Sequence, residues 1–297
     1  MALVRKKSIQ HDLNPDGDVI QSGRMMGTDN VTYNYRFAGG IPRVNATPYT
    51  YAIAEGDVPG HTAYTKLGYI YPVVNVEQDI SPVGGKYIFP TALGSMKLVS
   101  TNHLDRPGQA GIGTIRFSYL GGPGSYTAYS ETIALNGTIP VYSVGTAIYR
   151  LNAIRAVSTG GSLMALGSIT ITAPNVAGTP IYRCISTGYT RGRSLIYTVP
   201  EGKRLYINQY GISSAATAVG HFGRFIFRAT YDDGIGSYVP FMMPWLDTQI
   251  QDGMAHPELV TPVSLPEYCD VVGSVIGDSS NSNLSVTGSW RGWLEDE

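Results

Sequence analysis

The chain has few charged residues: Asp, Glu, Lys and Arg make up 14% of its 297 residues, about half of the usual share in a soluble domain. Glycine (36), tyrosine (21) and proline (18) are abundant instead. This composition favours an all-β protein whose strands pack together and whose outer surface is partly covered by partners. The formal net charge is −1. It gives no electrostatic footprint for nucleic acid, so no nucleic-acid partner is expected.

Cysteine is scarce and long apolar runs are missing. The two cysteines, Cys184 and Cys269, lie far apart in the sequence, which argues against a disulfide framework and favours a reducing compartment. No apolar run reaches the roughly 18 residues that predict a membrane-spanning helix. The N-terminal residues lack the apolar stretch of a secretory signal peptide. We therefore expect no membrane partner.

Sequence motifs for catalysis and cofactor binding are also missing. We find no nucleophile elbow, P-loop or dinucleotide-binding glycine signature. Asp232-Asp233-Gly234 lies between two predicted strands, which favours a hairpin turn over a pair of glycosidase carboxylates. The histidines are dispersed without the spacing of metal ligands; they are His11, His61, His103, His221 and His256. The sequence therefore predicts no enzyme, no catalytic residue, no cofactor and no metal site.

One segment, Asp12 to Asp18, resembles a calcium-binding loop. Its oxygen-bearing side chains occupy loop positions 1, 3, 5 and 7, and Gly17 occupies position 6. Position 12 of such a loop should be a bidentate glutamate, but it is Gly23 here. No flanking helices are predicted. We therefore interpret the segment as a Pro-Asp-Gly turn, with weak calcium binding as the alternative.

Short alternating segments separated by Gly, Pro and Asn turns dominate the chain from about residue 95. This pattern predicts β-sandwich or jelly-roll domains, with a first half or domain over residues 95–175 and a second over 176–297. Only Ala153–Val157 and Pro244–Gln251 are candidates for helix. The predicted strands are Ser95–Ser100, Gly113–Leu120, Tyr126–Leu135, Thr138–Val144, Ala147–Val157, Gly167–Thr172, Ile181–Ser186, Ser194–Val199, Lys203–Ser213, Phe222–Tyr231, Ser237–Phe241, Glu258–Leu265, Tyr268–Val275 and Leu284–Trp293.

Residues 1–94 follow a different pattern, in which turn residues recur between short aromatic or β-branched pieces: Val31–Phe37, Pro48–Ala54 and Lys66–Val76. A long irregular segment is unusual inside a compact domain. We expect an extended N-terminal arm or irregular β lead-in that lies along a neighbouring subunit. Near its start, Arg5, Lys6 and Lys7 form a weak candidate for binding an acidic partner, and a solvated chain end is the alternative.

Aromatic residues are numerous in the C-terminal half. Trp290 and Trp293 differ by three positions, so they face opposite sides of a strand, and we expect one in the core and the other at an interface. Packing or subunit contact is favoured over a sugar-binding platform for these tryptophans and for Tyr182, Tyr189, Tyr197, Tyr206 and Tyr210.

The stretch Glu131–Val141 is typical of a β-hairpin, because Asn136-Gly137 tolerates the positive φ angles of a tight turn. Together with Ser100–Leu120 and Leu195–Ile207, it resembles a family of virion proteins from tailed bacteriophages. The resemblance covers roughly residues 95–297. Where that family often has a Pro-Ala-Gly-Lys turn, this chain has Glu201 in place of the alanine. The resemblance implies a β-sandwich or jelly-roll building block of a virus particle, often trimeric, and brings no catalytic residues.

From this resemblance we expect a capsid cement or decoration protein on the outer surface of the virion, made in the cytoplasm of the host bacterium. It would be a homotrimer that binds the major capsid protein, and extended arms would give avidity. Two alternatives come from other classes of protein. One is a head or tail fibre that binds host surface glycans, and the other is a tail depolymerase.

Overall fold

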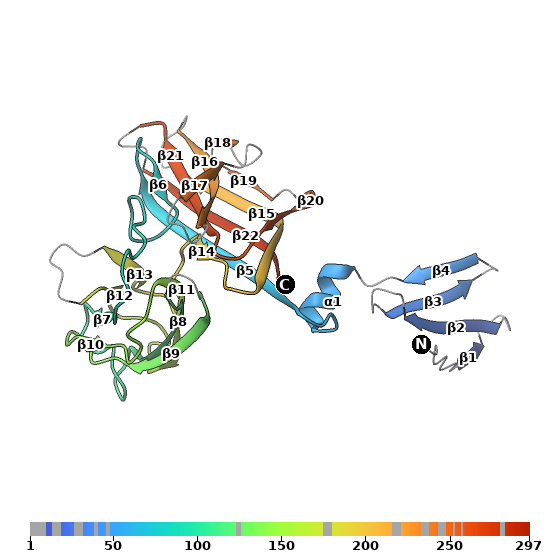
Figure 1. The fold of residues 1–297 in the computed structure, drawn as a ribbon, viewed down its shortest axis with the longest axis horizontal. Coiled ribbons are helices and arrows are strands. Elements are labelled where there is room, and N and C mark those ends of the chain that lie inside the picture. Colours follow the sequence, from blue (N-terminus) through green and yellow to red (C-terminus); the bar gives the residue numbers. More distant parts are fainter. Residues whose placement is uncertain are drawn as a thin grey trace. The chain divides into compact units, whose positions relative to one another are not determined.

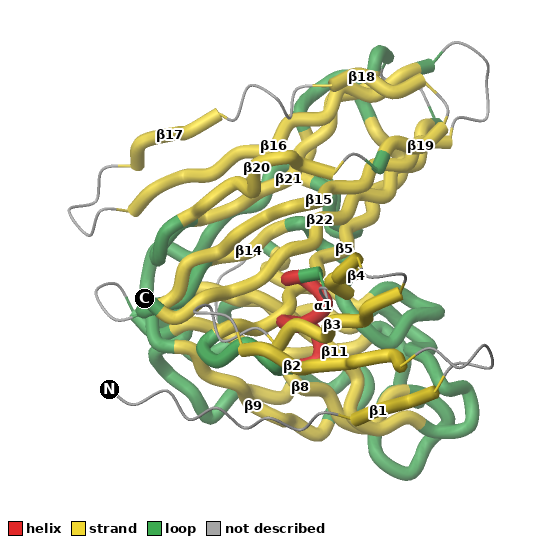
Figure 2. The backbone as a smooth tube through the Cα atoms, turned by 90° about the vertical axis from the view of Figure 1, so that its right-hand side faces the viewer, coloured by secondary structure: helices red, strands yellow, loops and turns green. Residues whose placement is uncertain are grey.

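In the computed structural model, strands dominate and α1 (Tyr49–Glu55) is the α-helix among the described residues (Figures 1 and 2). This confirms the predicted all-β class. The chain divides into two compact units, Met1–Tyr64 with Trp293–Asp296 and Thr65–Gly292 with Glu297. The structure describes residues 10–13, 19–26, 32–38, 41–45, 48–122, 126–174, 180–215, 221–232, 238–242, 248–251, 253–256, 258–279 and 283–297.

The first unit begins with a four-stranded antiparallel sheet in the order β1-β2-β3-β4. Each strand pairs with the next along the chain, so the sheet is a simple meander. The part of the sequence expected as an arm or irregular lead-in therefore contains regular strands that its many turn residues obscured. Their bounds are β1 (Gln10–Leu13), β2 (Val19–Met26), β3 (Thr32–Ala38) and β4 (Ile41–Asn45).

Helix α1 follows this sheet and occupies the piece Pro48–Ala54, which its aromatic and β-branched residues made look strand-like. Ala52 and Ile53 are buried. The helix ends at Gly56, which has a φ of 80° and donates its backbone N–H to the carbonyl of Ile53. Glycine adopts this left-handed conformation without a steric penalty, which is why it terminates the helix here.

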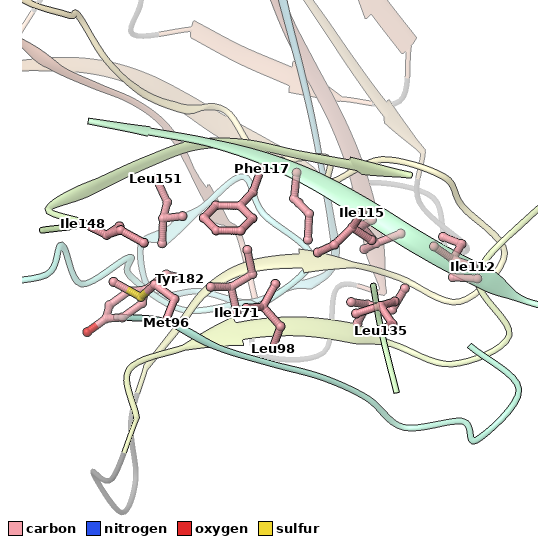
Figure 3. Packing of buried hydrophobic residues seen from close by; sticks show 14 residues of the cluster. Met96, Leu98, Ile112, Ile115, Phe117, Leu135, Ile148, Leu151, Ile171 and Tyr182 are labelled. Atoms are coloured by element: carbon pink, nitrogen blue, oxygen red, sulfur yellow. The ribbon is translucent and has the colours of Figure 1, made fainter. Parts of the chain in front are cut away.

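Two sheets of the second unit form the first sandwich. One sheet has the order β10-β7-β12-β13 and the other β11-β8-β9. Isoleucine, leucine and phenylalanine side chains from both sheets meet in one buried cluster, as Figure 3 shows for Leu98 and Ile171 on one side and Phe117 on the other. The strands are β7 (Lys97–Ser100), β8 (Ile112–Leu120), β9 (Ala128–Ala134), β10 (Val141–Tyr142), β11 (Arg150–Thr159), β12 (Ile169–Thr172) and β13 (Ile181–Ile185).

The stretch Glu131–Val141 is a corner between these two sheets, so the predicted hairpin is wrong. The tight turn itself is present, because Gly137 has a φ of 61°. However, β9 pairs with β8, whereas β10 pairs with β7. The turn is tied to the end of β7, since Ser100 donates its N–H to the carbonyl of Gly137 at 3.0 Å. This bond directs the chain across the sandwich instead of back along β9.

The second sandwich is built from the order β14-β21-β16-β17, with β6 and β18 at its margins, and the order β19-β15-β22-β5, with β20 also on β15. Aromatic contacts join the two sheets, such as Tyr197 against Trp290 with ring centroids 5.8 Å apart. The strands are β5 (His61–Val73), β6 (Gln78–Asp79), β14 (Ile196–Thr198), β15 (Lys203–Ala215), β16 (Phe222–Asp232), β17 (Tyr238–Met242), β18 (Thr248–Gln251), β19 (Gly253–Ala255), β20 (Glu258–Leu265), β21 (Asp270–Gly277) and β22 (Leu284–Asp296).

Each of the strands predicted from residue 95 onward has a counterpart, but both helical candidates are wrong as far as they are described. Ala153–Val157 lies within β11, where it pairs along β8. In Pro244–Gln251, the described residues form β18, which pairs with β16. The chain passes from the first sandwich to the second between Ile185, the end of β13, and Ile196, the start of β14. The division predicted from the sequence lay near residue 175. The predicted boundaries at 94 and 175 stay predictions.

Candidate functional site: a buried charged joint between the two sandwiches

The contact between the two sandwiches of the second unit is polar and deeply buried. Arg150 begins β11 in the first sandwich and Asp270 begins β21 in the second, and the side chain of each is 1% exposed. The guanidinium binds the carboxylate through two nitrogens, with Nε–Oδ1 and Nη2–Oδ2 distances of 3.1 Å each. The hydroxyl of Thr198 in β14 also donates to Asp270. A bidentate pair of this kind fixes orientation as well as distance.

The remaining donors of Arg150 are used as well. Its Nη1 donates to the carbonyls of Pro90 at 3.1 Å and Tyr149 at 3.3 Å. The guanidinium carbon lies 4.2 Å from the ring centroid of Tyr149 and 4.7 Å from that of Phe89. The cation is therefore enclosed by acceptors and aromatic faces, the conditions under which a charge can remain buried.

Asn152 extends the joint from β11 to β14. Its side-chain amide donates to the carbonyl of Thr198 at 2.8 Å and its side-chain oxygen accepts the Thr198 N–H at 2.9 Å. The Asn152 side chain therefore makes the same pair of hydrogen bonds to the Thr198 backbone that a neighbouring β-strand residue would make. Arg183, at 3% exposure, adds a second link because its Nη2 donates to the carbonyls of Leu151 and Ile196.

Lys66 completes the joint from β5. Its Nζ donates to the carbonyl of Asn152 and lies 5.6 Å from the ring centroid of Tyr197. Burial lowers the pKa of Lys66 well below its usual value, and the neighbouring charge of Arg183 lowers it further. The joint holds its polar groups against fixed internal partners, so the function this geometry supports is mechanical coupling of the sandwiches.

A second buried carboxylate, that of Asp105, connects two of the stretches on which the resemblance to phage virion proteins depends. Asp105 is 0% exposed. Its carboxylate accepts the Ser100 hydroxyl at 2.6 Å and the backbone N–H groups of Ile112 and Gly167, each at 2.9 Å. Its carbonyl accepts the N–H of Gly137 at 2.9 Å. Two of the three stretches that carry the phage resemblance therefore meet at one aspartate, while the third contains Thr198 and forms part of the joint.

Sequence reasoning missed Arg150, Asp270 and Asp105, since these residues are far apart in the chain or isolated in loops. The available signal was weak: Arg150 and Asp270 are charges inside segments that otherwise read as apolar strands. Conversely, the basic residues Arg5, Lys6 and Lys7 lie outside the described residues, so the partner-binding prediction for them stays a prediction.

The calcium-like segment coincides with the connection between β1 and β2. Asp12 pairs with Ile20 in the backbone register, and residues 14–18 lie outside the described part of the chain. Asp232 likewise ends β16 opposite Tyr238 of β17. The strands predicted on either side of Asp232-Asp233-Gly234 are therefore present and paired, whereas Asp233 and Gly234 lie outside the described residues. No group of three or more His, Cys, Asp or Glu side chains suited to a metal occurs among the described residues.

The histidines belong to different elements of the fold. His11 is in β1 and His103 in an exposed loop. His61 contacts the Tyr49 hydroxyl at 2.7 Å, whereas His221 contacts Asp278 at 2.9 Å. His256 lines a surface hollow with Gln209, Tyr210, Gly211, Ser289 and Arg291.

Most of the aromatic residues considered for a sugar-binding platform are buried. Trp290 is 0% and Trp293 7% exposed, so the expected division into one core and one interface tryptophan is wrong. They do point to different partners, because Trp293 packs edge-on against Tyr49 and Trp290 against Tyr197. Tyr182, Tyr197 and Tyr210 are buried, Tyr206 is half-buried and Tyr189 is exposed.

Both cysteines are free thiols, with Cys184 half-buried and Cys269 buried. Burial and the neighbouring Asp270 raise the pKa of Cys269 to about 12. Within the described ranges, no helix is long and apolar enough to cross a membrane.

No protein-family model matches the chain, and no curated protein is detectably similar to it. Among solved structures, the VP2 subviral particle of infectious bursal disease virus is similar at 10% identity over 80% of this chain and 72% of that chain, with a TM-score of 0.22. The Gx strain of the same virus matches at 12% identity over 84% and 77%, with a TM-score of 0.23. TM-scores this low do not indicate a common fold, so the proposals below depend on the chain's own features.

Proposed function

We propose that the protein is a structural component of a phage virion, a capsid cement or decoration protein that bridges major capsid proteins as a homotrimer. The sequence resemblance over residues 95–297 supports the virion assignment. The buried joint supports a mechanical role, because a bidentate, buried ion pair resists rotation of one sandwich against the other.

The observation that carries the proposal is an exposed apolar edge on the first sandwich. It consists of Tyr129, Ile139, Tyr142 and Val144, which are 51%, 59%, 54% and 87% exposed. The Glu131 carboxylate accepts the Val144 N–H at 2.6 Å, so the segments that carry Tyr129 and Val144 lie side by side. Apolar side chains gathered in this way are typical of a surface that a subunit or partner covers.

The oligomeric state tests this edge directly. Light scattering on the purified protein should give the mass of a trimer, and Tyr142→Ser with Val144→Ser should shift it toward the monomer. The matched control is Leu163→Ser, because Leu163 is 71% exposed but lies outside the edge. A wild-type monomer at micromolar concentration that also fails to associate with capsids would contradict the proposal.

Particle assays test the role itself. Phage particles that lack the protein should lose DNA at lower temperature or under milder osmotic shock, while adsorption to the host stays normal. Fragile heads follow from loss of a bridge between capsid proteins. Failed adsorption with robust heads would instead identify a fibre that binds host glycans.

A separate experiment tests whether the N-terminal four-stranded sheet contributes to attachment to the particle. Because β4 ends at Asn45, a deletion of residues 2–47 removes the whole four-stranded sheet and leaves α1 in place. We expect the truncated protein to keep its β-sheet circular dichroism but to occupy fewer sites on particles, since an appended element adds contacts through avidity. Unchanged occupancy would refute a role for this sheet in attachment.

A further inference from the structure

The outer face of the β11-β8-β9 sheet carries three arginines in one row. Arg116 of β8 pairs with Arg155 of β11, and Arg155 pairs in turn with Arg191 through an isolated bridge. All three side chains are exposed. Residues directly opposite one another in a sheet point to the same face, so the three guanidinium groups form a row across neighbouring strands.

Burial of the alternate residues establishes which face this is. Ile115 and Phe117, on either side of Arg116, are 0% exposed and belong to the sandwich core, as does Ile154 beside Arg155. Successive side chains on a strand point to opposite faces, so the arginines point away from the core. With strands about 4.8 Å apart, the row is about 10 Å long.

The backbone bonds bring Arg155 and Arg191 especially close. Ala156 donates to the carbonyl of Thr190 at 2.7 Å, and Gly192 donates to that of Ile154 at 2.9 Å. These bonds flank the pair, which is therefore a non-hydrogen-bonded pair, the arrangement in which opposite side chains are closer. Like charges in this position destabilise a sheet.

No acidic residue stands at the outward positions of this face that the structure describes. Its other outward positions, paired in register around the arginines, are small residues: Thr114, Ser118, Ser130, Thr132, Ala134 and Ala153. Arg116 donates to the Ser130 hydroxyl at 2.6 Å. The nearest acid along the strands, Glu131, is paired with the core residue Phe117 and binds the N–H groups of Val144 and Gly145.

We propose that this face is a docking surface for an acidic protein, whose carboxylates bind Arg116, Arg155 and Arg191. Charge complementarity favours that occupant, since planar guanidinium groups bind carboxylates bidentately. The flat surface of small side chains suits another protein surface. Single-stranded nucleic acid is usually held by aromatic stacking in a basic groove, and none of the outward positions named above is aromatic.

The inference deepens the proposed function by naming the face that binds and the chemistry of the partner. It rests on the proposed function only in taking that partner to be a virion protein. Its test therefore needs no virus. Binding of the full-length protein to immobilised poly-L-glutamate should be measured by interferometry at several salt concentrations. We expect binding that weakens as salt rises, because exposed charges are screened.

The row variant is Arg116→Gln with Arg155→Gln, and the matched control is Arg106→Gln with Arg291→Gln, two exposed arginines elsewhere on the second unit. The row variant should bind poly-L-glutamate roughly tenfold more weakly, from about two- to fivefold for each exposed charge contact. The control should stay within about twofold of the wild type. The melting temperature of the row variant should be equal to or above that of the wild type, because like-charge repulsion is relieved.

Three results would overturn the proposal. Equal losses in both variants would mean that poly-L-glutamate binds through net charge alone. Tighter row-dependent binding of single-stranded DNA or heparin than of poly-L-glutamate would assign the row to a nucleic acid or a sulfated glycan. A lower melting temperature in the row variant would mean that the arginines stabilise the sheet itself. None of these results depends on whether the protein occupies capsids.

Discussion

Neutralising Asp270 should uncouple the two sandwiches of the second unit. The substitution Asp270→Asn keeps the size of the side chain but removes its charge. Arg150 would remain 1% exposed, with the neutral carbonyls of Pro90 and Tyr149 as acceptors for its Nη1. A buried charge left without its counterion costs about 3–5 kcal/mol of the free energy of unfolding.

This cost is large enough to measure without ambiguity. For a unit of roughly 150–250 residues, each kcal/mol lowers the melting temperature by about 2–4 °C, so a decrease of about 10 °C is expected. The form of the transition should change as well. Because the pair joins residues of different sandwiches, its loss should split a single calorimetric transition into two.

A double-mutant cycle separates the ion pair from its surroundings. Arg150→Met should cost about as much as Asp270→Asn, because it leaves the buried carboxylate without this cation and removes the contact with the Tyr149 ring. The double variant should be less destabilised than the sum of the two, with a coupling of about 0.5–3 kcal/mol between partners in contact. Glu258→Gln, at an exposed position, controls for the change in net charge. Additive effects, or a melting temperature within about 2 °C of wild type in Asp270→Asn, would refute the claim that the Arg150–Asp270 pair couples the two sandwiches.

Other predictions follow from single buried groups. Because burial lowers the pKa of Lys66, the folded chain releases this proton at a lower pH than the unfolded chain does. The free energy of unfolding in urea should therefore increase from pH 7 to pH 10, and Lys66→Met should remove this increase. Gly111→Ala should cost about 2 kcal/mol or more in urea unfolding, since its Cβ would lie 2.1 Å from Asp105 Oδ1; Gly161→Ala, with open space, is the control. Cys269, buried and with a pKa near 12, should resist Ellman's reagent until the protein unfolds.

The strands could be predicted from the sequence because their signal is local. Alternation of apolar and polar residues and the flanking turn residues lie within about ten positions of each other, and β8 or β15 needs nothing more to be recognised. The partners of each strand could not be predicted in the same way. Asn136-Gly137 satisfies the local rules for a hairpin, yet the chain crosses to the other sheet because Ser100 and Asp105 bind Gly137.

The joint and the arginine row could not be predicted for the same reason. Arg150 and Asp270 are 120 residues apart, and no periodicity links them. Arg116, Arg155 and Arg191 come together only through the register of β8 with β11 and the bridge beyond it. A shift of one residue in that register would send the arginines of one strand to the core face. Such sites are products of pairing, which the folded chain as a whole determines.

The two groups of charges in the second unit have opposite energetic roles, and the difference indicates where partners bind. At the joint, Arg150 has a carboxylate, carbonyls and aromatic rings within contact distance, so its charge is compensated inside the molecule. On the outer face, Arg155 stands between two other arginines, and none of the described outward positions paired around it is acidic. An uncompensated row reduces stability in the free protein. A partner's carboxylates would remove that repulsion, and the free energy released would strengthen binding of the partner. This gain is available only to an acidic partner.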